Sequence, residues 1–200
     1  MAIITVDCDE VLADTTRALL SYHHNVFCGI PLVWEDISNY HFEYLPQMIA
    51  GGLDRDMAAV MFNTFIAEQS LEKVQPLPYI YDILFDLKKQ GHTLYVITAR
   101  HDAVKDVTLQ RLDKHFPALF HDVVFTNYFT DAYTCKLDVC QSLGSQCMID
   151  DNLIHAEKVA SYKIPTIMPA MPWNADYNNT NPYIIKVQDH HAMRDALVQQ

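Results

Sequence analysis

The segment Ile3-Ile-Thr-Val6-Asp7-Cys-Asp9 decides the fold class that the sequence predicts. Its first four residues are apolar or β-branched and too few for a helix, and acidic residues follow them directly, which is typical of a buried parallel strand. Runs of the same kind follow later in the chain, at residues 93–97 and 147–149 and, with less regular patterns, at 123–126 and 166–168.

Segments of helical length separate these runs, at residues 79–90, 104–115 and 136–143. Gly91 and Gly144 stand where the first and the last of these helices would end, as glycine commonly does. Strands that alternate with helices are joined by right-handed crossovers into one mostly parallel sheet. We therefore expect a doubly wound, Rossmann-like α/β fold.

Residues 15–76 do not follow this alternation. Two helical patterns, at residues 16–27 and 55–69, flank an aromatic segment at 34–45. We predict that residues 15–76 form a small helical cap, inserted after the first strand into an α/β core of residues 1–14 and 77–200. Composition alone is equally compatible with an extra helical layer of the core, but the insertion begins where open α/β sheets bind their ligands, which favours the cap.

The composition agrees with one compact domain that carries a small inserted lobe. The chain has 200 residues, 50% of them hydrophobic and 20% charged, so it can bury a sizeable core. Its 14 basic and 25 acidic residues give a formal net charge of −11, and the sequence has no basic run, which argues against a surface for polymeric nucleic acid. A small anion held by a metal remains compatible with this charge.

The sequence does not resemble that of a membrane or secreted protein. Its longest apolar stretches are broken well short of the roughly 20 residues that span a bilayer, and the N-terminal segment reaches an acid at Asp7 without a basic region. The five cysteines form no C-x-x-C pair, which argues against a disulfide framework and a thiolate zinc site. We expect a cytoplasmic protein with reduced thiols and no membrane partner.

Four carboxylates follow two of the predicted strands: Asp7 and Asp9 after the first strand, and Asp150 and Asp151 after residues 147–149. A single aspartate in such a position is usually a turn or helix-capping residue. Two groups of them converge, however, because the carboxyl ends of parallel strands share one edge of a sheet. Crowded carboxylates need a cation, and an all-oxygen ligand set without histidine or cysteine suits Mg²⁺.

Asp7 and Asp9 also suit the hydrolysis of a phosphate ester. Alternate residues that leave a strand can place one carboxylate in line with phosphorus and the other beside the leaving oxygen, so that one attacks and the other transfers a proton. Thr98 follows residues 93–97 and offers a hydroxyl, and Lys136 begins a predicted helix and offers a cation to a phosphoryl oxygen. Taken singly, such a threonine is usually a cap and such a lysine is usually solvated.

The order of these groups resembles the four motifs of the haloacid dehalogenase superfamily phosphatases. The chain has Val-Asp7-Cys-Asp9-Glu-Val-Leu-Ala-Asp-Thr, then Val-Ile-Thr98-Ala-Arg100, then Lys136, and then Met-Ile-Asp150-Asp151-Asn. The resemblance covers the chain outside the predicted cap. It implies that Asp7 is the nucleophile and Asp9 the general acid and base. It also implies that Thr98 and Lys136 hold the phosphate, and that Mg²⁺ is bound by Asp7, the Asp9 carbonyl and Asp151, with Asp150 in support.

A second resemblance is to the 5′(3′)-deoxyribonucleotidases and their bacterial relatives. It rests on Asp-x-Asp-x-Val-Leu-Ala-Asp, the short helical insert, Thr98-Ala-Arg100, Leu-x-x-His-Phe-Pro-x-Leu-Phe and a late Pro-Trp-Asn. The deoxyribonucleotidases have Thr-Ser-Pro where this chain has Thr-Ala-Arg. Arg100 either binds the phosphate or sugar of a substrate or pairs with a surface acid.

Aromatic residues crowd the early part of the predicted cap, at Trp34, Tyr40, Phe42 and Tyr44. They either stack on a nucleobase, since aromatic faces accept any planar ring, or form a small core of the cap. Together with the second resemblance they favour a nucleoside monophosphate as the substrate.

We therefore predict a Mg²⁺-dependent phosphomonoesterase that acts through an aspartyl phosphate, a 5′-nucleotidase on (deoxy)nucleoside monophosphates. The alternatives are a phosphatase or phosphotransferase for another small phosphometabolite, and a non-catalytic phosphate-binding module. A receiver domain also gathers acids, a threonine and a lysine around Mg²⁺, but its lysine comes last, whereas Lys136 precedes Asp150 and Asp151. The presence of Asp7, Asp9 and Lys136 favours an enzyme over a binding module.

Overall fold

The computed structural model of the chain describes residues 1–26, 32–41, 44–45, 48, 50–52, 54–68, 73–128 and 130–198. One of the predicted substrate-binding residues, Phe42, lies outside the described residues.

A six-stranded, all-parallel sheet forms the centre of the molecule, with the strand order β3-β2-β1-β4-β5-β6. The strands are β1 (Ile3–Val6), β2 (Thr93–Thr98), β3 (Asp122–Phe125), β4 (Cys147–Ile149), β5 (Thr166–Pro169) and β6 (Ile184–Val187). The chain starts in the middle of the sheet, and the direction of winding reverses between β1 and β4. In open α/β sheets the ligand crevice lies outside the carboxyl ends of the strands at such a switch point.

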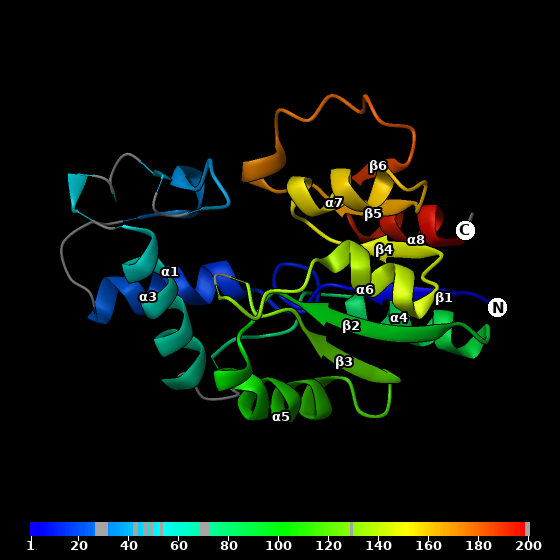
Figure 1. The fold of residues 1–200 in the computed structure, drawn as a ribbon, viewed down its shortest axis with the longest axis horizontal. Coiled ribbons are helices and arrows are strands. Elements are labelled where there is room, and N and C mark those ends of the chain that lie inside the picture. Colours follow the sequence, from blue (N-terminus) through cyan, green and yellow to red (C-terminus); the bar gives the residue numbers. More distant parts are fainter. Residues whose placement is uncertain are drawn as a thin grey trace.

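Helices cover both faces of this sheet (Figure 1). α4 (Ile80–Lys89), α5 (Lys105–His115) and α8 (His190–Val198) share one apolar cluster with the strands. α6 (Lys136–Leu143) and α7 (Leu153–Ala160) pack with the strands in two further clusters. The predicted doubly wound α/β fold is confirmed.

Two helices and one strand of the core are missing from the sequence prediction. The strand β6 lies at the sheet edge, and the half-buried Lys186 interrupts its apolar run. The helices α7 and α8 are only 8 and 9 residues long. Their length gives little room for a repeating apolar pattern, and neither is followed by a glycine such as Gly144, which marks the end of the equally short α6.

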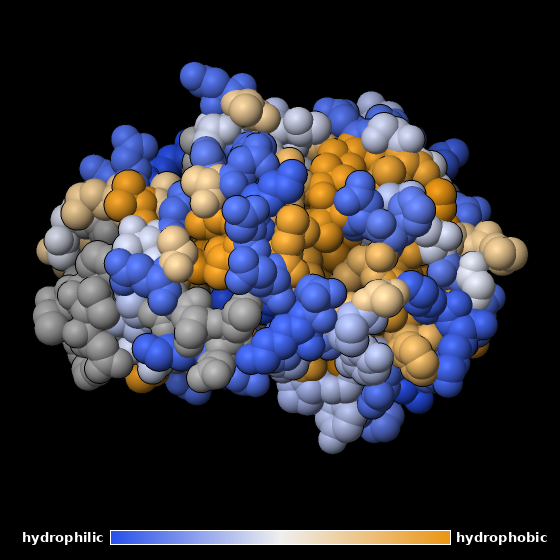
Figure 2. Space-filling view, turned by 90° about the horizontal axis from the view of Figure 1, so that it is seen from below, coloured by the Kyte–Doolittle hydropathy of each residue, from blue (hydrophilic) through white to orange (hydrophobic). Residues whose placement is uncertain are grey.

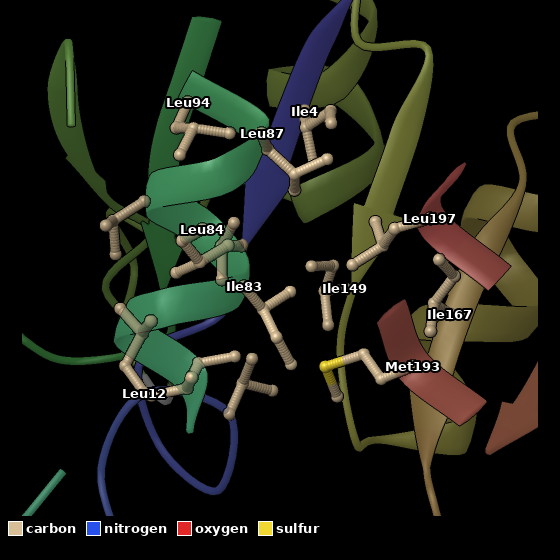
Figure 3. Close-up of a cluster of buried hydrophobic side chains, with 14 of the residues drawn as sticks. Ile4, Leu12, Ile83, Leu84, Leu87, Leu94, Ile149, Ile167, Met193 and Leu197 are labelled. Atoms are coloured by element: carbon tan, nitrogen blue, oxygen red, sulfur yellow. The ribbon is translucent and has the colours of Figure 1, made fainter. Parts of the chain in front are cut away.

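The largest cluster of buried apolar side chains holds α4 and α8 against the sheet (Figure 3). The figure labels Ile83, Leu84 and Leu87 of α4, Met193 and Leu197 of α8, Leu12 of the loop after β1, and Ile4, Leu94, Ile149 and Ile167 of four strands. These side chains point toward one another from elements that are far apart in the sequence. The apolar contacts therefore fix β1 and β4 side by side, which determines where the residues that come after these strands lie.

The insertion after β1 lies beside the carboxyl ends of the strands and not on either face of the sheet (Figure 1). Its helices α1 (Thr15–Val26) and α3 (Arg55–Glu68) share an apolar cluster that also contains Val74 and, from the core, Val104. The two helices begin within one residue of the predicted starts, and the predicted last residues, 27 and 69, lie outside the described part. The division into a core of residues 1–14 and 77–200 and a cap of residues 15–76 stays a prediction.

The surface of the molecule mixes apolar and polar side chains. Figure 2 shows apolar patches over the half of the molecule that contains the sheet, with hydrophilic side chains between them. Exposed large apolar residues are scattered over several elements, as at Tyr79, Phe85 and Ile154, which is normal for a globular domain. Within the described ranges, no helix has both the length and the apolar character that crossing a bilayer requires.

We expect Leu84→Ala to lower the free energy of unfolding by about 2 to 5 kcal/mol, because it leaves a cavity at a fully buried position between α4 and the sheet. Urea denaturation measures this loss. Asp82→Ala, at an exposed position of the same helix, should cost less than about 1 kcal/mol. Equal losses in the two variants would contradict the packing of α4 on the sheet.

Candidate active site

Three carboxylates meet at the switch point of the sheet. Asp7 follows β1, and Asp150 and Asp151 follow the neighbouring strand β4. One carboxylate oxygen from each residue lies within 4.8 Å of the others, and all three side chains are buried. The backbone N–H of Asp7 donates to the carbonyl of Ile149 at 2.9 Å, so strand pairing continues up to the acids. The structure thus brings together three of the four acids that the sequence singles out.

The ammonium group of Lys136 lies between two of these acids. Lys136 is the first residue of α6, and its Nζ is 2.8 Å from Oδ2 of Asp7 and 2.7 Å from Oδ2 of Asp150. Burial by itself lowers the pKa of the ammonium group. Attraction to Asp150 and Asp7 outweighs burial and raises the pKa of Lys136 above its ordinary value, so Lys136 is a cation here.

Lys136 alone does not balance the negative charge of the three acids. Burial raises the pKa of Asp7 to about 7, with further contributions from Asp150 and Asp9, although Lys136 acts in the opposite direction. Burial, followed by repulsion from Asp150, raises the pKa of Asp151 well above its usual range. A divalent cation at this point would remove the repulsion between the carboxylates.

Asp151 has an oxygen available for such a cation. Its Oδ2 accepts a hydrogen bond from the indole N–H of Trp173 at 2.8 Å, whereas its Oδ1 is buried and has no hydrogen-bond partner among the described residues. Asp150 uses Oδ2 for Lys136 and Oδ1 for the backbone N–H of Asn152 at 2.9 Å. Oxygen ligands of this kind fit Mg²⁺, and the contacts favour Asp151 over Asp150 as a direct ligand.

Asp9 does not join the acid cluster but pairs with Arg100. The guanidinium group of Arg100 donates to both carboxylate oxygens, with Nη2 to Oδ1 at 2.6 Å and Nε to Oδ2 at 3.0 Å. The hydroxyl of Thr15, the first residue of α1, also donates to Oδ1 at 2.5 Å. Arg100 thus pairs with the predicted general acid and base and not with a surface acid. That it binds the phosphate or sugar of a substrate stays a prediction.

The Arg100 contact sets the charge of Asp9. Burial by itself raises the pKa of Asp9, but the attraction and the hydrogen bonds of Arg100, together with the bond from Thr15, outweigh burial and lower that pKa. Arg100 is itself completely buried, and Nη1 donates to the hydroxyl of Thr108 at 2.9 Å. Asp9 is therefore a carboxylate in this arrangement, held from both the core and α1.

Thr98 lies at the same edge of the sheet. It is the last residue of β2 and lies two positions beyond Val96, which pairs with Val6, so it reaches the level of the loop that starts at Asp7. Its hydroxyl accepts a hydrogen bond from the backbone N–H of Arg100 at 3.2 Å. Asp7, Asp9, Thr98 and Lys136 thus all lie around the ends of β1 and β2 and the start of α6.

Comparison with known proteins identifies the family of this chain. The family model described as haloacid dehalogenase-like hydrolase matches residues 4–130, which is more than half of the chain. The chain belongs to the haloacid dehalogenase-like hydrolases. A search of curated proteins finds no significant match.

Solved structures show the same fold at low sequence identity. A haloacid dehalogenase-like hydrolase from Streptococcus pneumoniae has 16% identity and a TM-score of 0.69, with 100% of this chain and 99% of the other covered. A protein from Clostridium acetobutylicum described as a predicted phosphatase has 17% identity and a TM-score of 0.69, with the same coverage. Protein tyrosine kinase A from Mycobacterium tuberculosis has 17% identity and a TM-score of 0.71, with 98% and 97% covered. The three proteins are described with different activities, so the likeness supports the fold and does not identify a substrate.

A cavity of about 120 Å³ separates the insertion from the core of this hydrolase, next to Asp9 and Arg100. Aromatic rings from both sides line it: Tyr40, His41 and Phe62 from the insertion, and Tyr128 and Trp173 from the core. Sequence reasoning singled out only Tyr40 of these five as a substrate contact. The late Pro-Trp-Asn motif contained Trp173, but the sequence carries no signal that brings Phe62 and Tyr128 to this place.

The other predicted aromatic contacts lie elsewhere. Trp34 does not line this cavity, and its ring packs under the guanidinium group of Arg17, 3.9 Å from the ring centroid. Tyr44 is 58% exposed and packs edge-on against His41. Of the three predicted substrate-binding aromatics that the structure describes, Tyr40 lines the cavity and Trp34 and Tyr44 do not.

Glu10 connects the nucleophile loop with the insertion, which sequence reasoning did not anticipate. Its carboxylate accepts a hydrogen bond from the backbone N–H of Thr16 at 2.6 Å, at the start of α1. Burial raises the pKa of Glu10 to about 8. Together with the bond from Thr15 to Asp9, this contact fixes the first turn of α1 directly beside the acids.

His155 is a buried histidine next to this site. It lies on α7, 5.9 Å from the ring of Tyr128, and is 5% exposed. Burial and the nearby Lys136 cation lower the pKa of His155 to about 4, so its imidazole is neutral near pH 7.

We expect His155 to make folding sensitive to acid. In the unfolded chain the imidazole takes up a proton near its ordinary pKa of about 6.5, whereas in the folded chain it does so only near pH 4. Its contribution, up to about 3 kcal/mol, is complete above pH 6.5 and is lost as the pH falls toward 4. Denaturation of wild type and His155→Gln across this pH range should show the wild type losing stability relative to the variant. A constant difference between them would refute this expectation.

Proposed function

We propose that this haloacid dehalogenase-like hydrolase is a Mg²⁺-dependent phosphomonoesterase that acts through an aspartyl phosphate. The observation that carries the proposal is the separation of two carboxylates on one short loop. Asp7 lies in the acid cluster with Lys136, and Asp9, two residues later, lies outside it in contact with Arg100. A nucleophile and a proton-transfer group need such different surroundings.

In the first half of the proposed reaction, a carboxylate oxygen of Asp7 attacks phosphorus. The bond from phosphorus to the ester oxygen breaks, and Asp9 gives the leaving oxygen a proton. Lys136 and Thr98 hold phosphoryl oxygens, and Mg²⁺, when bound by Asp7, the Asp9 carbonyl and Asp151, supplies positive charge against the incoming dianion. Arg100 favours the unprotonated form of Asp9, so before this step the contact between Arg100 and Asp9 has to loosen and Asp9 has to take up a proton from water.

In the second half, water attacks the phosphorus of the acyl phosphate. Asp9 takes a proton from this water, the bond between phosphorus and Asp7 breaks, and phosphate leaves. The pairing of Asp9 with Arg100 and Thr15 supports this step directly, because it keeps Asp9 as a carboxylate that can accept a proton.

The cavity beside Asp9 supports a nucleoside monophosphate as the substrate. Its aromatic lining can accept a planar base, and the polar residues Asn63 and Thr16 also line the cavity. The insertion over the sheet edge limits the substrate to a small molecule, and the net charge of −11 does not favour a polymeric one. A cytoplasmic location is part of the same proposal and agrees with the reduced thiols expected from the sequence.

We expect Asp7→Asn to reduce phosphate release by several orders of magnitude, because the amide keeps the shape of the side chain and removes the nucleophile.

Excess EDTA should abolish the wild-type activity, since the crowded acids and a phosphate dianion repel each other without a cation. Asp9→Asn should slow turnover severely. The measurement is phosphate release from a panel of nucleotides and sugar phosphates with Mg²⁺.

Asp138→Asn is the matched control, because Asp138 is exposed on α6, two residues from Lys136. Its activity should equal that of the wild type. More than a few per cent of wild-type activity in Asp7→Asn would show that another group attacks phosphorus.

A stacked base predicts a selective effect of Phe62→Ala. Loss of the ring should cost roughly 1 to 3 kcal/mol of binding, seen as a raised KM for the preferred nucleotide and little change for p-nitrophenyl phosphate. Tyr44→Ala, which removes an exposed ring outside the cavity, should leave both values unchanged. Equal wild-type efficiency toward nucleotides and sugar phosphates would reject the nucleotidase assignment and leave the phosphatase assignment standing.

A further inference from the structure

A short turn after β5 holds Asp151 at two points. In the turn η4 (Pro172–Asn174), the indole N–H of Trp173 donates to Oδ2 of Asp151 at 2.8 Å. The side-chain amide of Asn174 donates to the Asp151 carbonyl at 2.9 Å and to the Pro169 carbonyl at 2.8 Å. Asn174 is 1% exposed, so these bonds are shielded from water. Asn174 thus fixes the backbone of Asp151, and Trp173 fixes its side chain.

The contact from Trp173 decides which oxygen of Asp151 remains for a cation. With Oδ2 occupied by the indole, Oδ1 is the oxygen that a cation in the cluster can use, and Oδ1 is buried without a partner in the described part of the chain. A carboxylate with no such contact could rotate about its terminal torsion, which has broad minima. The indole removes this freedom at low cost, because a tryptophan ring has only two side-chain torsions to fix.

The packing of Trp173 comes from the insertion. Its ring lies edge-on to Trp34 at 5.7 Å between centroids and to Tyr40 at 6.3 Å. It also packs against a buried apolar cluster of the insertion that includes Leu20 and Ile37. Residues of the insertion therefore hold Trp173 in place, and Trp173 in turn contacts Asp151 of the core.

We propose that Trp173 is a positioning residue that orients Asp151 for Mg²⁺ binding through its indole N–H. This inference rests on the metal site of the proposed function. Groups that hydrogen-bond to a metal-binding carboxylate typically change metal affinity by about 10- to 100-fold when they are removed. A role in packing alone would need the ring but not the N–H, and the two roles can be separated by experiment.

The test is Mg²⁺ binding to the metal-free full chain, measured by isothermal titration calorimetry without substrate. Trp173→Phe keeps an aromatic ring and removes the donor, and we expect its Kd for Mg²⁺ to rise at least about tenfold, with a Tm in EDTA close to that of the wild type. Trp34→Phe, which keeps an aromatic ring against Trp173 and leaves the donor, should keep the wild-type Kd. Asp151→Asn should weaken binding at least as much as Trp173→Phe.

A second measurement does not depend on the folding of the Trp173 variant. The chain has two tryptophans, so in Trp34→Phe the fluorescence comes from Trp173 alone. Its emission should change on addition of Mg²⁺ with the Kd from calorimetry and return with EDTA.

Two results overturn the inference alone: a wild-type Kd in Trp173→Phe, or no change of Trp173 emission when calorimetry shows that Mg²⁺ binds. Absence of Mg²⁺ binding by the wild-type chain instead overturns the proposed metal site, and with it this inference.

Discussion

The bonds of one buried ammonium group to two carboxylates are the interaction on which the site depends. Lys136 contacts Asp7 and Asp150, which come from different strands, and is itself almost inaccessible to solvent. Without a cation between them, these acids would repel each other at the end of a sheet whose apolar contacts force β1 and β4 together. Lys136 therefore reduces the repulsion between the acids. The negative charge that it does not neutralise makes the acid cluster suitable for a second cation.

Much of this arrangement could be predicted from the sequence, because it depends on short apolar strands and on the acidic residues directly after them. Asp7, Asp150 and Asp151 converge as expected, since parallel strands place their carboxyl ends at one edge. Asp9 could also be predicted from its position after β1, but its contact with Arg100 could not. The pairing of Asp9 with Arg100 depends on the path of the chain after β2, and no periodicity or composition encodes it.

The cavity is the least predictable part for a related reason. Trp34, Tyr40 and Tyr44 are close together in the sequence, yet of these three only Tyr40 lines the cavity, although Trp34 and Tyr40 both pack against Trp173. The rings that line the cavity come from four separate segments, and their meeting depends on how the insertion packs against the core. Contacts between distant segments of this kind are fixed by tertiary packing, which local patterns do not contain.

The position of β1 in the middle of the sheet also has a consequence for the order in which the molecule can form. β1 is made first, but one of its two neighbours is β4, and contacts such as that of Thr5 with Ser145 join residues 140 positions apart. Closing so large a loop is entropically costly and slow. During synthesis, Asp150 and Asp151 leave the ribosome only after β4, so until then Asp7 lacks the other two acids of the cluster and β1 lacks one of the strands that flank it.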